Sequence, residues 1–253
     1  MLGWALVLAV IGIGVLSTGT ALGQQPSEQP PDTTAATTDE GAGLYGRNCA
    51  SCHGNQGEGT FRGPTLIGVG AASVDYWLRS GRMPIAEPDE DARRGEPNFT
   101  DAQIRQLVTH VIGFTDPAAD QGPPIPDIDL AGANLAEGGQ LYRVNCASCH
   151  NWDGKGGALV NRNNAPPLHP VPIRQVAEAV RIGPGAMPNF TTEQLDEQQL
   201  TDVLAYVDYL RTPQDRGGFG LAHWGPSTET IAGFVAMIVL VLVTAWLGER
   251  RGR

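Results

Sequence analysis

Apolar residues recur at helical spacing in four stretches of the chain, which form two pairs. The first pair covers residues 41–45 and 104–111, and the second covers 138–142 and 200–210. Spacings of three and four residues put the apolar side chains of each stretch on one face, which predicts amphipathic helices. Because the same order of elements occurs twice, the pattern predicts an all-α protein with two domains related by internal duplication.

Two longer segments are apolar on every face. Residues 1–23 carry no charge and predict either a cleaved secretory signal peptide or an N-terminal membrane anchor. Residues 230–247 are eighteen residues without a charge, and Trp224 and Trp246 lie near the two ends of this segment. The segment predicts a transmembrane helix, with a buried core helix as the alternative. Three arginines in the following tail, 248–253, predict that the C-terminus is cytoplasmic and that the two domains lie on the extracytoplasmic side of the cell membrane.

Polar and proline-rich segments separate these elements. They lack the apolar residues needed for a core, so they are typical of linkers. The predicted organisation is a flexible linker at 24–39, a first domain at 40–114, a linker at 115–134, a second domain at 135–212 and a Gly/Pro-rich segment at 213–229.

The composition is acidic, with a net charge of −10 and Lys155 as the single lysine. Acidity argues against nucleic acid as a partner. It favours a basic or mixed-charge protein partner only weakly, because a solvated acidic surface explains it equally well.

The candidate chemistry lies in a hexapeptide that occurs twice. Residues 48–53 and 145–150 both read Asn-Cys-Ala-Ser-Cys-His. Two thiols three positions apart can add across the two vinyl groups of one porphyrin, and the next imidazole then faces the iron, so each copy predicts one covalently bound haem c. The predicted thioether residues are Cys49, Cys52, Cys146 and Cys149, and the predicted proximal ligands are His53 and His150.

The same cysteines are also compatible with two other kinds of site. A Cys-x-x-Cys pair can be a redox dithiol, and two pairs together can bind zinc through four thiolates. Neither alternative requires a histidine after the second cysteine in both copies. Neither explains the Met-Pro dipeptide that follows each motif, at Met83 and at Met187.

Each domain resembles class I cytochrome c, from the first helix and the haem motif to the Met loop and the closing helix. The resemblance implies that Met83 and Met187 are the distal iron ligands. It implies that the carbonyls of Pro64 and Pro166 hold the second nitrogen of each proximal imidazole. It also implies that the first and last helices of each domain cross, with the crossing residues being Gly41, Gly138, Tyr206 and, in the place of an aromatic residue, His110.

Two such domains before a C-terminal anchor resemble the dihaem cytochrome c subunit of the actinobacterial menaquinol–cytochrome c reductase, the cytochrome bcc complex. The most specific matching stretches outside the haem motifs are 63–70, 81–84 and 154–158. The resemblance implies an electron relay, without catalytic residues of its own, within a quinol–cytochrome-c reductase. The implied partners are the cytochrome b subunit, the Rieske iron–sulfur subunit that donates electrons and the terminal cytochrome c oxidase that receives them.

Three other functions remain open at this stage. The chain could be a membrane-anchored carrier that serves several reductases, or the acceptor subunit of a periplasmic dehydrogenase. A dihaem peroxidase is the third alternative, and it requires an iron with a vacant or displaceable position, which ligation by both histidine and methionine does not provide.

Overall fold

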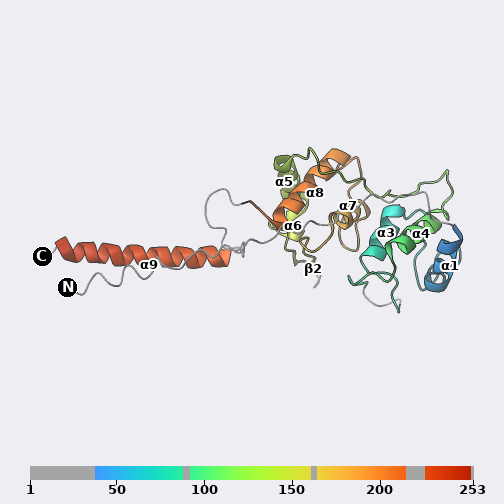
Figure 1. Cartoon of the computed structure of the whole chain (residues 1–253), viewed down its shortest axis with the longest axis horizontal. Coiled ribbons are helices and arrows are strands. Elements are labelled where there is room, and N and C mark those ends of the chain that lie inside the picture. The colour runs from blue at the N-terminus through green and yellow to red at the C-terminus, as the bar shows by residue number, and fades with distance from the viewer. Residues whose placement is uncertain (1–37, 88–91, 161–163, 215–225, 252–253) are drawn as a thin grey trace. The chain divides into compact units, whose positions relative to one another are not determined.

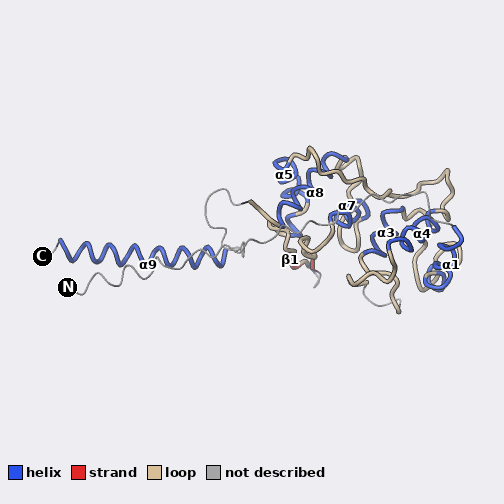
Figure 2. The backbone as a smooth tube through the Cα atoms, viewed as in Figure 1, coloured by secondary structure: helices blue, strands red, loops and turns tan. Residues whose placement is uncertain are grey.

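The computed structural model describes residues 38–87, 92–160, 164–214 and 226–251 (Figure 1). The predicted signal or anchor at 1–23 and nearly all of the linker at 24–39 lie outside these residues, as does most of the segment at 213–229. Within the described part, helices joined by loops dominate and one short two-stranded ribbon is present (Figure 2). The all-α prediction is confirmed.

The first domain consists of four helices around one apolar core. They are α1 (Thr38–Asn48), α2 (Ala50–His53), α3 (Ala71–Arg79) and α4 (Asp101–Ile112). Helix α4 begins with a capping box, because Thr100 and Gln103 each bond the backbone N–H of the other. The buried core residues come mainly from α1 and α4: Leu44, Tyr45, Leu78, Ile104, Leu107, Val108 and Val111.

The second domain repeats this order. Its helices are α5 (Leu135–Asn145), α6 (Ala147–His150), α7 (Ile173–Ile182) and α8 (Glu197–Arg211). Between α6 and α7, β1 (Gly157–Ala158) and β2 (Asn164–Ala165) pair antiparallel, with Gly157 opposite Ala165. The buried core residues are Tyr142, Val176, Ala177, Val180, Leu195, Leu200, Val203, Leu204 and Val207.

The first and last helices of each domain cross at a glycine. A Cβ atom on Gly41 would lie 2.5 Å from the carbonyl oxygen of Gln106, and one on Gly138 would lie 1.9 Å from that of Asp202. Both distances are below van der Waals contact, so only glycine allows the backbones to come this close. The crossings inferred from the class I cytochrome c resemblance are therefore confirmed.

An aromatic pair covers each crossing. In the first domain the rings of Tyr45 and His110 have centroids 5.3 Å apart, and in the second those of Tyr142 and Tyr206 are 5.5 Å apart. His110 thus packs where the second domain has a tyrosine. This is the packing role that the sequence assigned to it.

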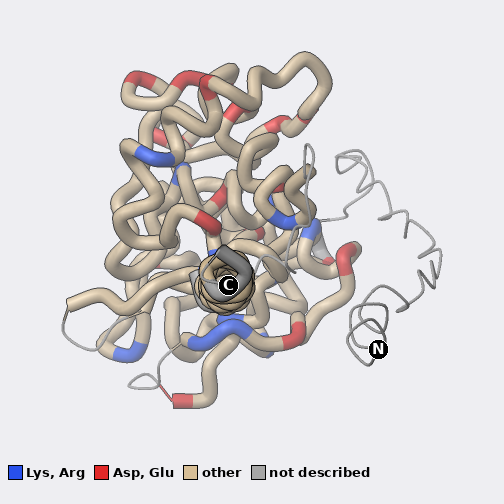
Figure 3. The backbone as a smooth tube through the Cα atoms, turned by 90° about the vertical axis from the view of Figure 1, so that its left-hand side faces the viewer, with Lys and Arg blue, Asp and Glu red and all other residues tan. Residues whose placement is uncertain are grey.

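The two domains contact each other through α3 and α7, which lie next to each other in Figure 1. Acidic and basic residues both occur at scattered points along the described part of the backbone (Figure 3). The interface itself contains a group of buried charged side chains that the helical periodicity did not indicate.

Helix α9 (Pro226–Arg251) contains a segment, Thr230–Gly248, that is long and apolar enough to cross a membrane. None of this 19-residue window is buried against the rest of the chain. A buried core helix is therefore the wrong interpretation of this segment. The helix is compatible with a C-terminal membrane anchor, and which side of the membrane each end occupies stays a prediction.

Candidate haem-binding sites

In the first domain, the haem motif lies on a single turn that continues from α1. The backbone N–H of Cys49 donates to the carbonyl of Tyr45 at 2.8 Å, and that of His53 donates to the carbonyl of Cys49 at 2.9 Å. The imidazole Nδ1 of His53 lies 2.8 Å from the carbonyl oxygen of Pro64. A carbonyl can only accept, so Nδ1 carries the proton and Nε2 is left with its lone pair, as an iron ligand requires.

The second domain builds the same turn with nearly the same distances. The backbone N–H of Cys146 donates to Tyr142 at 2.8 Å, and that of His150 donates to Cys146 at 2.9 Å. The imidazole Nδ1 of His150 lies 3.0 Å from the carbonyl oxygen of Pro166. The inferred contacts of Pro64 and Pro166 are confirmed, and in both domains they fix the tautomer of the proximal imidazole.

A buried tyrosine secures the far end of each turn. The hydroxyl of Tyr45 donates to the carbonyl of Gly54 at 2.7 Å, and that of Tyr142 donates to the carbonyl of Asn151, also at 2.7 Å. Gly54 and Asn151 directly follow the two histidines and adopt positive φ values of 82° and 64°. The tyrosine therefore holds the point at which the chain leaves the helix and turns back toward the proline.

In the first domain the predicted ligands lie around one cavity. Its volume is about 400 Å³, within the range of small-molecule and cofactor pockets. His53, Cys49 and Met83 all line it, and Trp77 and Leu107 are among its apolar residues. The cavity thus brings together one thiol, an imidazole and a thioether, and the second thiol of the motif, Cys52, directly precedes His53. These are the groups that a haem c needs, so the residues present fit this cofactor.

In the second domain, Cys146 and Met187 both pack against the apolar core, and His150 is buried. Burial, and to a smaller extent the neighbouring Cys149, raises the pKa of the Cys146 thiol to about 11. The corresponding causes raise the pKa of the Cys49 thiol to about 11.

These thiols are therefore protonated at neutral pH, unlike those of redox dithiols, whose pKa values are lowered. The described residues also form no cluster of His, Cys, Asp and Glu suited to a metal ion, so a zinc centre built from both motifs is not supported.

The two methionine loops are held in different ways. In the first domain the backbone N–H groups of Arg82 and Met83 both donate to the carbonyl of Trp77, at 3.1 Å, at the end of α3. In the second domain the N–H of Met187 donates to the carbonyl of Pro184 at 3.2 Å, within its own loop. Just beyond it, the N–H of Phe190 donates to the carbonyl of Val180 in α7 at 2.8 Å, so this loop too is bound to the preceding helix through its backbone.

Arg181 adds side-chain contacts to the same segment. Its buried guanidinium donates from Nη1 to the carbonyls of Phe190, at 3.1 Å, and Leu195, at 2.7 Å, and from Nη2 to Glu197 at 2.8 Å. These bonds tie α7 to the chain that follows Met187. This role of Arg181 could not be predicted from the sequence, since nothing in the helical pattern distinguishes it from a solvent-exposed arginine.

His169 is placed away from a ligand role. Its Nε2 lies 2.7 Å from the carbonyl oxygen of Asp153, so this nitrogen is already in a hydrogen bond. The described residues offer Met187, in the loop after α7, as the distal candidate of the second domain.

Each of the two helical domains has a Cys-x-x-Cys-His turn, an imidazole hydrogen-bonded to a proline carbonyl, and a methionine loop. This arrangement defines a tandem cytochrome c protein. The family model for "Cytochrome C oxidase, cbb3-type, subunit III" matches residues 36–111 and 133–207. A cytochrome bc1 complex cytochrome c subunit of Corynebacterium diphtheriae is 33% identical over 260 residues, covering 97% of this chain and 92% of that protein. The chain therefore belongs to the family of cytochrome bc1 complex cytochrome c subunits, and haem c is its cofactor.

Other relatives agree with this assignment. The cytochrome bc1 complex cytochrome c subunit of Mycobacterium tuberculosis is 36% identical over 229 residues, covering 87% of this chain and 80% of that protein. The Cbb3-type cytochrome c oxidase subunit CcoP of Cereibacter sphaeroides is 29% identical over 198 residues, covering 70% of this chain and 62% of that protein. The family resemblance inferred from the sequence is confirmed.

Proposed function

We propose that this chain is the dihaem electron-transfer subunit of a membrane-bound quinol–cytochrome c reductase. In this proposal it accepts electrons from the Rieske iron–sulfur subunit, beside a cytochrome b subunit, and passes them to the terminal cytochrome c oxidase. The observation that carries the proposal is the repetition of one ligand arrangement in two domains of a chain that belongs to this family.

The proposed ligands divide into three roles in each domain. Cys49 and Cys52, and correspondingly Cys146 and Cys149, would hold the porphyrin covalently. His53 and His150 would bind the iron through Nε2, because each Nδ1 is held by a proline carbonyl. Met83 and Met187 would provide the opposite ligands.

Bound haem c would supply one-electron transfer, and ligation by both histidine and methionine would leave no open position for oxygen or peroxide. The protein's contribution is then to hold ligands in place. The proline carbonyl fixes the imidazole tautomer, the tyrosine hydroxyl fixes the turn, and the apolar cavity excludes water and so influences the reduction potential. These features favour a relay over a dihaem peroxidase.

The membrane arrangement is also part of the proposal. Helix α9 would anchor the chain in the cell membrane, with its arginine-rich end in the cytoplasm and both haem domains outside. An epitope accessibility assay on intact cells tests this, because a tag after Arg253 should be protected from added protease while the haem domains are not. The opposite protection pattern would overturn the orientation.

Counting covalent haem per polypeptide tests the cofactor proposal. We expect the mass of the mature chain to exceed that of the bare polypeptide by two haem groups. Replacing Cys49 and Cys52 with alanine should leave one, and replacing Cys146 and Cys149 should leave the other. A single haem in the unmodified chain, or none, would contradict the dihaem assignment.

Methionine ligation is tested by Met83→Leu and Met187→Leu, each of which conserves volume and should cost less than about 1.5 kcal/mol of stability. Each variant should lose one of two thioether charge-transfer bands and lower one reduction potential by a substantial part of the roughly 0.8 V range that axial ligands span. Met237→Leu, in the apolar helix, is the matched control and should change neither.

Purification from membranes tests the assignment to a complex. The chain should be recovered with a b-type cytochrome, a Rieske protein and an oxidase. Recovery with a periplasmic dehydrogenase, or as a free carrier without any b-type cytochrome, would favour the alternatives instead.

A further inference from the structure

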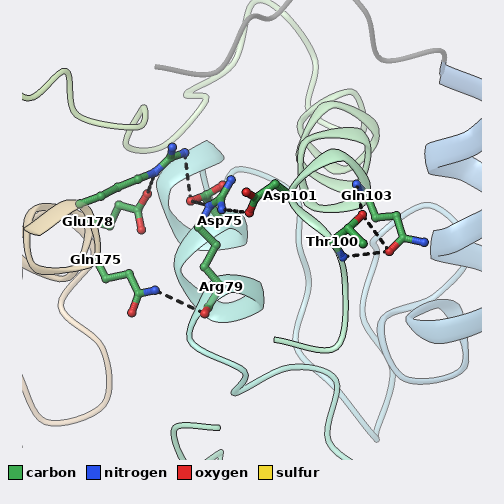
Figure 4. A network of polar contacts seen from close by, with 8 residues as sticks. Asp75, Arg79, Thr100, Asp101, Gln103, Gln175 and Glu178 are labelled. Carbon is green, nitrogen blue, oxygen red and sulfur yellow. Dashed lines mark hydrogen bonds and ion pairs between the residues drawn. The ribbon is translucent and has the colours of Figure 1, made fainter. Parts of the chain in front are cut away.

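Two carboxyl groups from different domains meet at the contact between α3 and α7. Asp75 belongs to α3 and is 1% exposed, and Glu178 belongs to α7 and is completely buried. Figure 4 shows the two side chains between their helices. Burial of two carboxyl groups side by side is costly unless charge is neutralised, so the surrounding groups decide their state.

Arg174 connects the two acids. Its Nε lies 3.0 Å from Glu178 Oε1, and its Nη2 lies 3.1 Å from Asp75 Oδ2. The same oxygen of Asp75 accepts from Arg79 Nε at 2.8 Å, and Arg79 also pairs with the exposed Asp101 at the start of α4. Each acid therefore has one oxygen bound to arginine.

The other oxygen of each acid has no arginine partner. Asp75 Oδ1 and Glu178 Oε2 are both buried and have no hydrogen-bond partner among the described residues, while Arg174 is bound to both side chains and so holds them near each other. Ionised carboxylates only accept hydrogen bonds, so a proton on one of the two acids would supply the donor that both oxygens lack.

We propose that Asp75 and Glu178 share one proton across the domain interface and act as positioning residues that hold the two haem sites at a fixed separation. The role in electron transfer rests on the proposed function above, whereas the shared proton does not. Because electron transfer slows steeply with distance, a rigid contact between the domains would directly support a relay.

The pKa of Glu178 agrees with a proton that lies mainly on this residue. Burial first, and then the neighbouring Asp75, raise the pKa of Glu178 from 4.5 to about 9, and Arg174 opposes this rise. Other charged and titratable groups near the pair are Tyr76 and Arg79 on α3, Asp101 on α4, and Arg82 and Arg94 from the loop between them. Burial raises the pKa of the Tyr76 hydroxyl above its ordinary value of 10, so this group stays protonated between pH 4.5 and 9.

Two hydrogen bonds that involve no carboxyl group flank the pair and bridge the same interface. Arg94 Nη2 donates to Gln175 Oε1 at 2.6 Å, and Gln175 Nε2 donates to the carbonyl of Arg79 at 3.3 Å. These contacts do not depend on pH in this range, so they should retain part of the docking when the shared proton is lost.

The sign of the pH effect follows from the raised pKa. Docked domains bind the proton between pH 4.5 and 9, whereas separated domains expose Glu178 and release it. Docking is therefore strongest below pH 4.5 and weakens as pH rises toward 9, with the opening constant increasing about tenfold per pH unit for one proton.

Two substitutions of similar size separate the shared proton from simple packing. Glu178→Gln places an N–H where the proton lies and keeps an oxygen for Arg174, so it should preserve docking and remove its pH dependence. Glu178→Met keeps the volume but leaves Asp75 Oδ1 without a donor, so docking should be weak at every pH.

The experiment uses the full haem-loaded chain in detergent. Infrared spectroscopy should detect the carbonyl stretch of a buried protonated carboxyl at pH 7, absent from Glu178→Gln and titrating near pH 9. The rate of amide hydrogen exchange is measured for peptides from α3 and α7 and divided by the rate for a peptide from α1. This ratio should rise about a hundredfold between pH 6 and 8, because separation of the domains releases one proton.

The proposal is overturned if the infrared band is missing from the unmodified chain, or if Glu178→Gln keeps the pH dependence of exchange. Both measurements are independent of electron transfer. A wrong haem count with an intact infrared band would therefore contradict the proposed function and leave the shared proton standing.

Discussion

The two domains share their ligand arrangement but differ in how each methionine loop is supported. In the first domain the backbone around Met83 is bound to the end of α3. In the second, Arg181 reaches from α7 to the carbonyls of Phe190 and Leu195, beyond Met187. Backbone bonds therefore tie the loop to the preceding helix in both copies, and in the second copy a buried arginine adds side-chain bonds to them.

The helix crossings of the two domains also differ, in how closely the two backbones approach. The backbones approach more closely at Gly138 than at Gly41. Together these differences make the second domain more sensitive to individual substitutions, which three sets of variants can test.

The largest effect is expected from Gly138→Ala. The new Cβ would lie 1.9 Å from a backbone oxygen of α8, so the helices must separate, and we expect a loss of about 3 kcal/mol or more. Gly41→Ala meets the Gln106 carbonyl at 2.5 Å and should cost less. Calorimetry of the full chain should show one domain melting earlier in each variant.

Gly46→Ala is the matched control, since nothing lies within 4 Å of the added atom on α1. It should stabilise the first domain by about 0.5–1 kcal/mol. Equal melting shifts for Gly41→Ala and Gly138→Ala would contradict the difference between the crossings.

An intermediate effect is expected from Arg181→Ala. Two buried carbonyls and Glu197 lose a charged donor, which should cost about 3 kcal/mol and loosen the Met187 loop. Titration with imidazole, which competes with the thioether for ferric iron, should become easier at the second site only.

Arg82→Ala is the counterpart in the first domain. Arg82 lies over the ring of Tyr76, with its guanidinium carbon 5.2 Å from the centroid, a contact worth about 0.5–1 kcal/mol. The variant keeps the backbone bonds around Met83, so imidazole binding at the first site should change little. Similar responses to both arginine substitutions would show that the two loops are supported alike.

The smallest effect concerns the helix caps. Asp196→Ala and Thr100→Ala each remove the capping side chain at the start of the last helix of a domain, a change that costs about 0.5–2 kcal/mol. Asp196 accepts from Gln199 at 2.8 Å and Thr100 from Gln103 at 3.4 Å, so the aspartate should contribute more. Denaturant titration of each variant measures this, and a larger loss for Thr100→Ala would go against it.

The features that could be predicted from the sequence depend on residues close together in the chain. The haem motifs, the amphipathic helices and the apolar α9 all have local signals. The contacts of Pro64, Pro166, Gly41 and Gly138 were reached only through the family resemblance, because each joins residues far apart.

The domain interface could not be predicted. Asp75 and Arg79, like Arg174 and Glu178, are oppositely charged residues four positions apart on a helix, the usual pattern of a solvent-exposed pair. Their burial results from the packing of α3 against α7, which are almost a hundred residues apart. The role of Arg181 could not be predicted either, because its position in the helical pattern gives no sign that its side chain is buried.

The crossing of the first and last helices has a consequence for biogenesis. Each cysteine-bearing turn follows directly from a helix whose partner is made last, so neither pocket can close until its whole domain has been synthesised. The thiols of each motif therefore stay accessible to a modifying group until the last helix of their domain has packed against the first. The first domain reaches this point in the chain before the second.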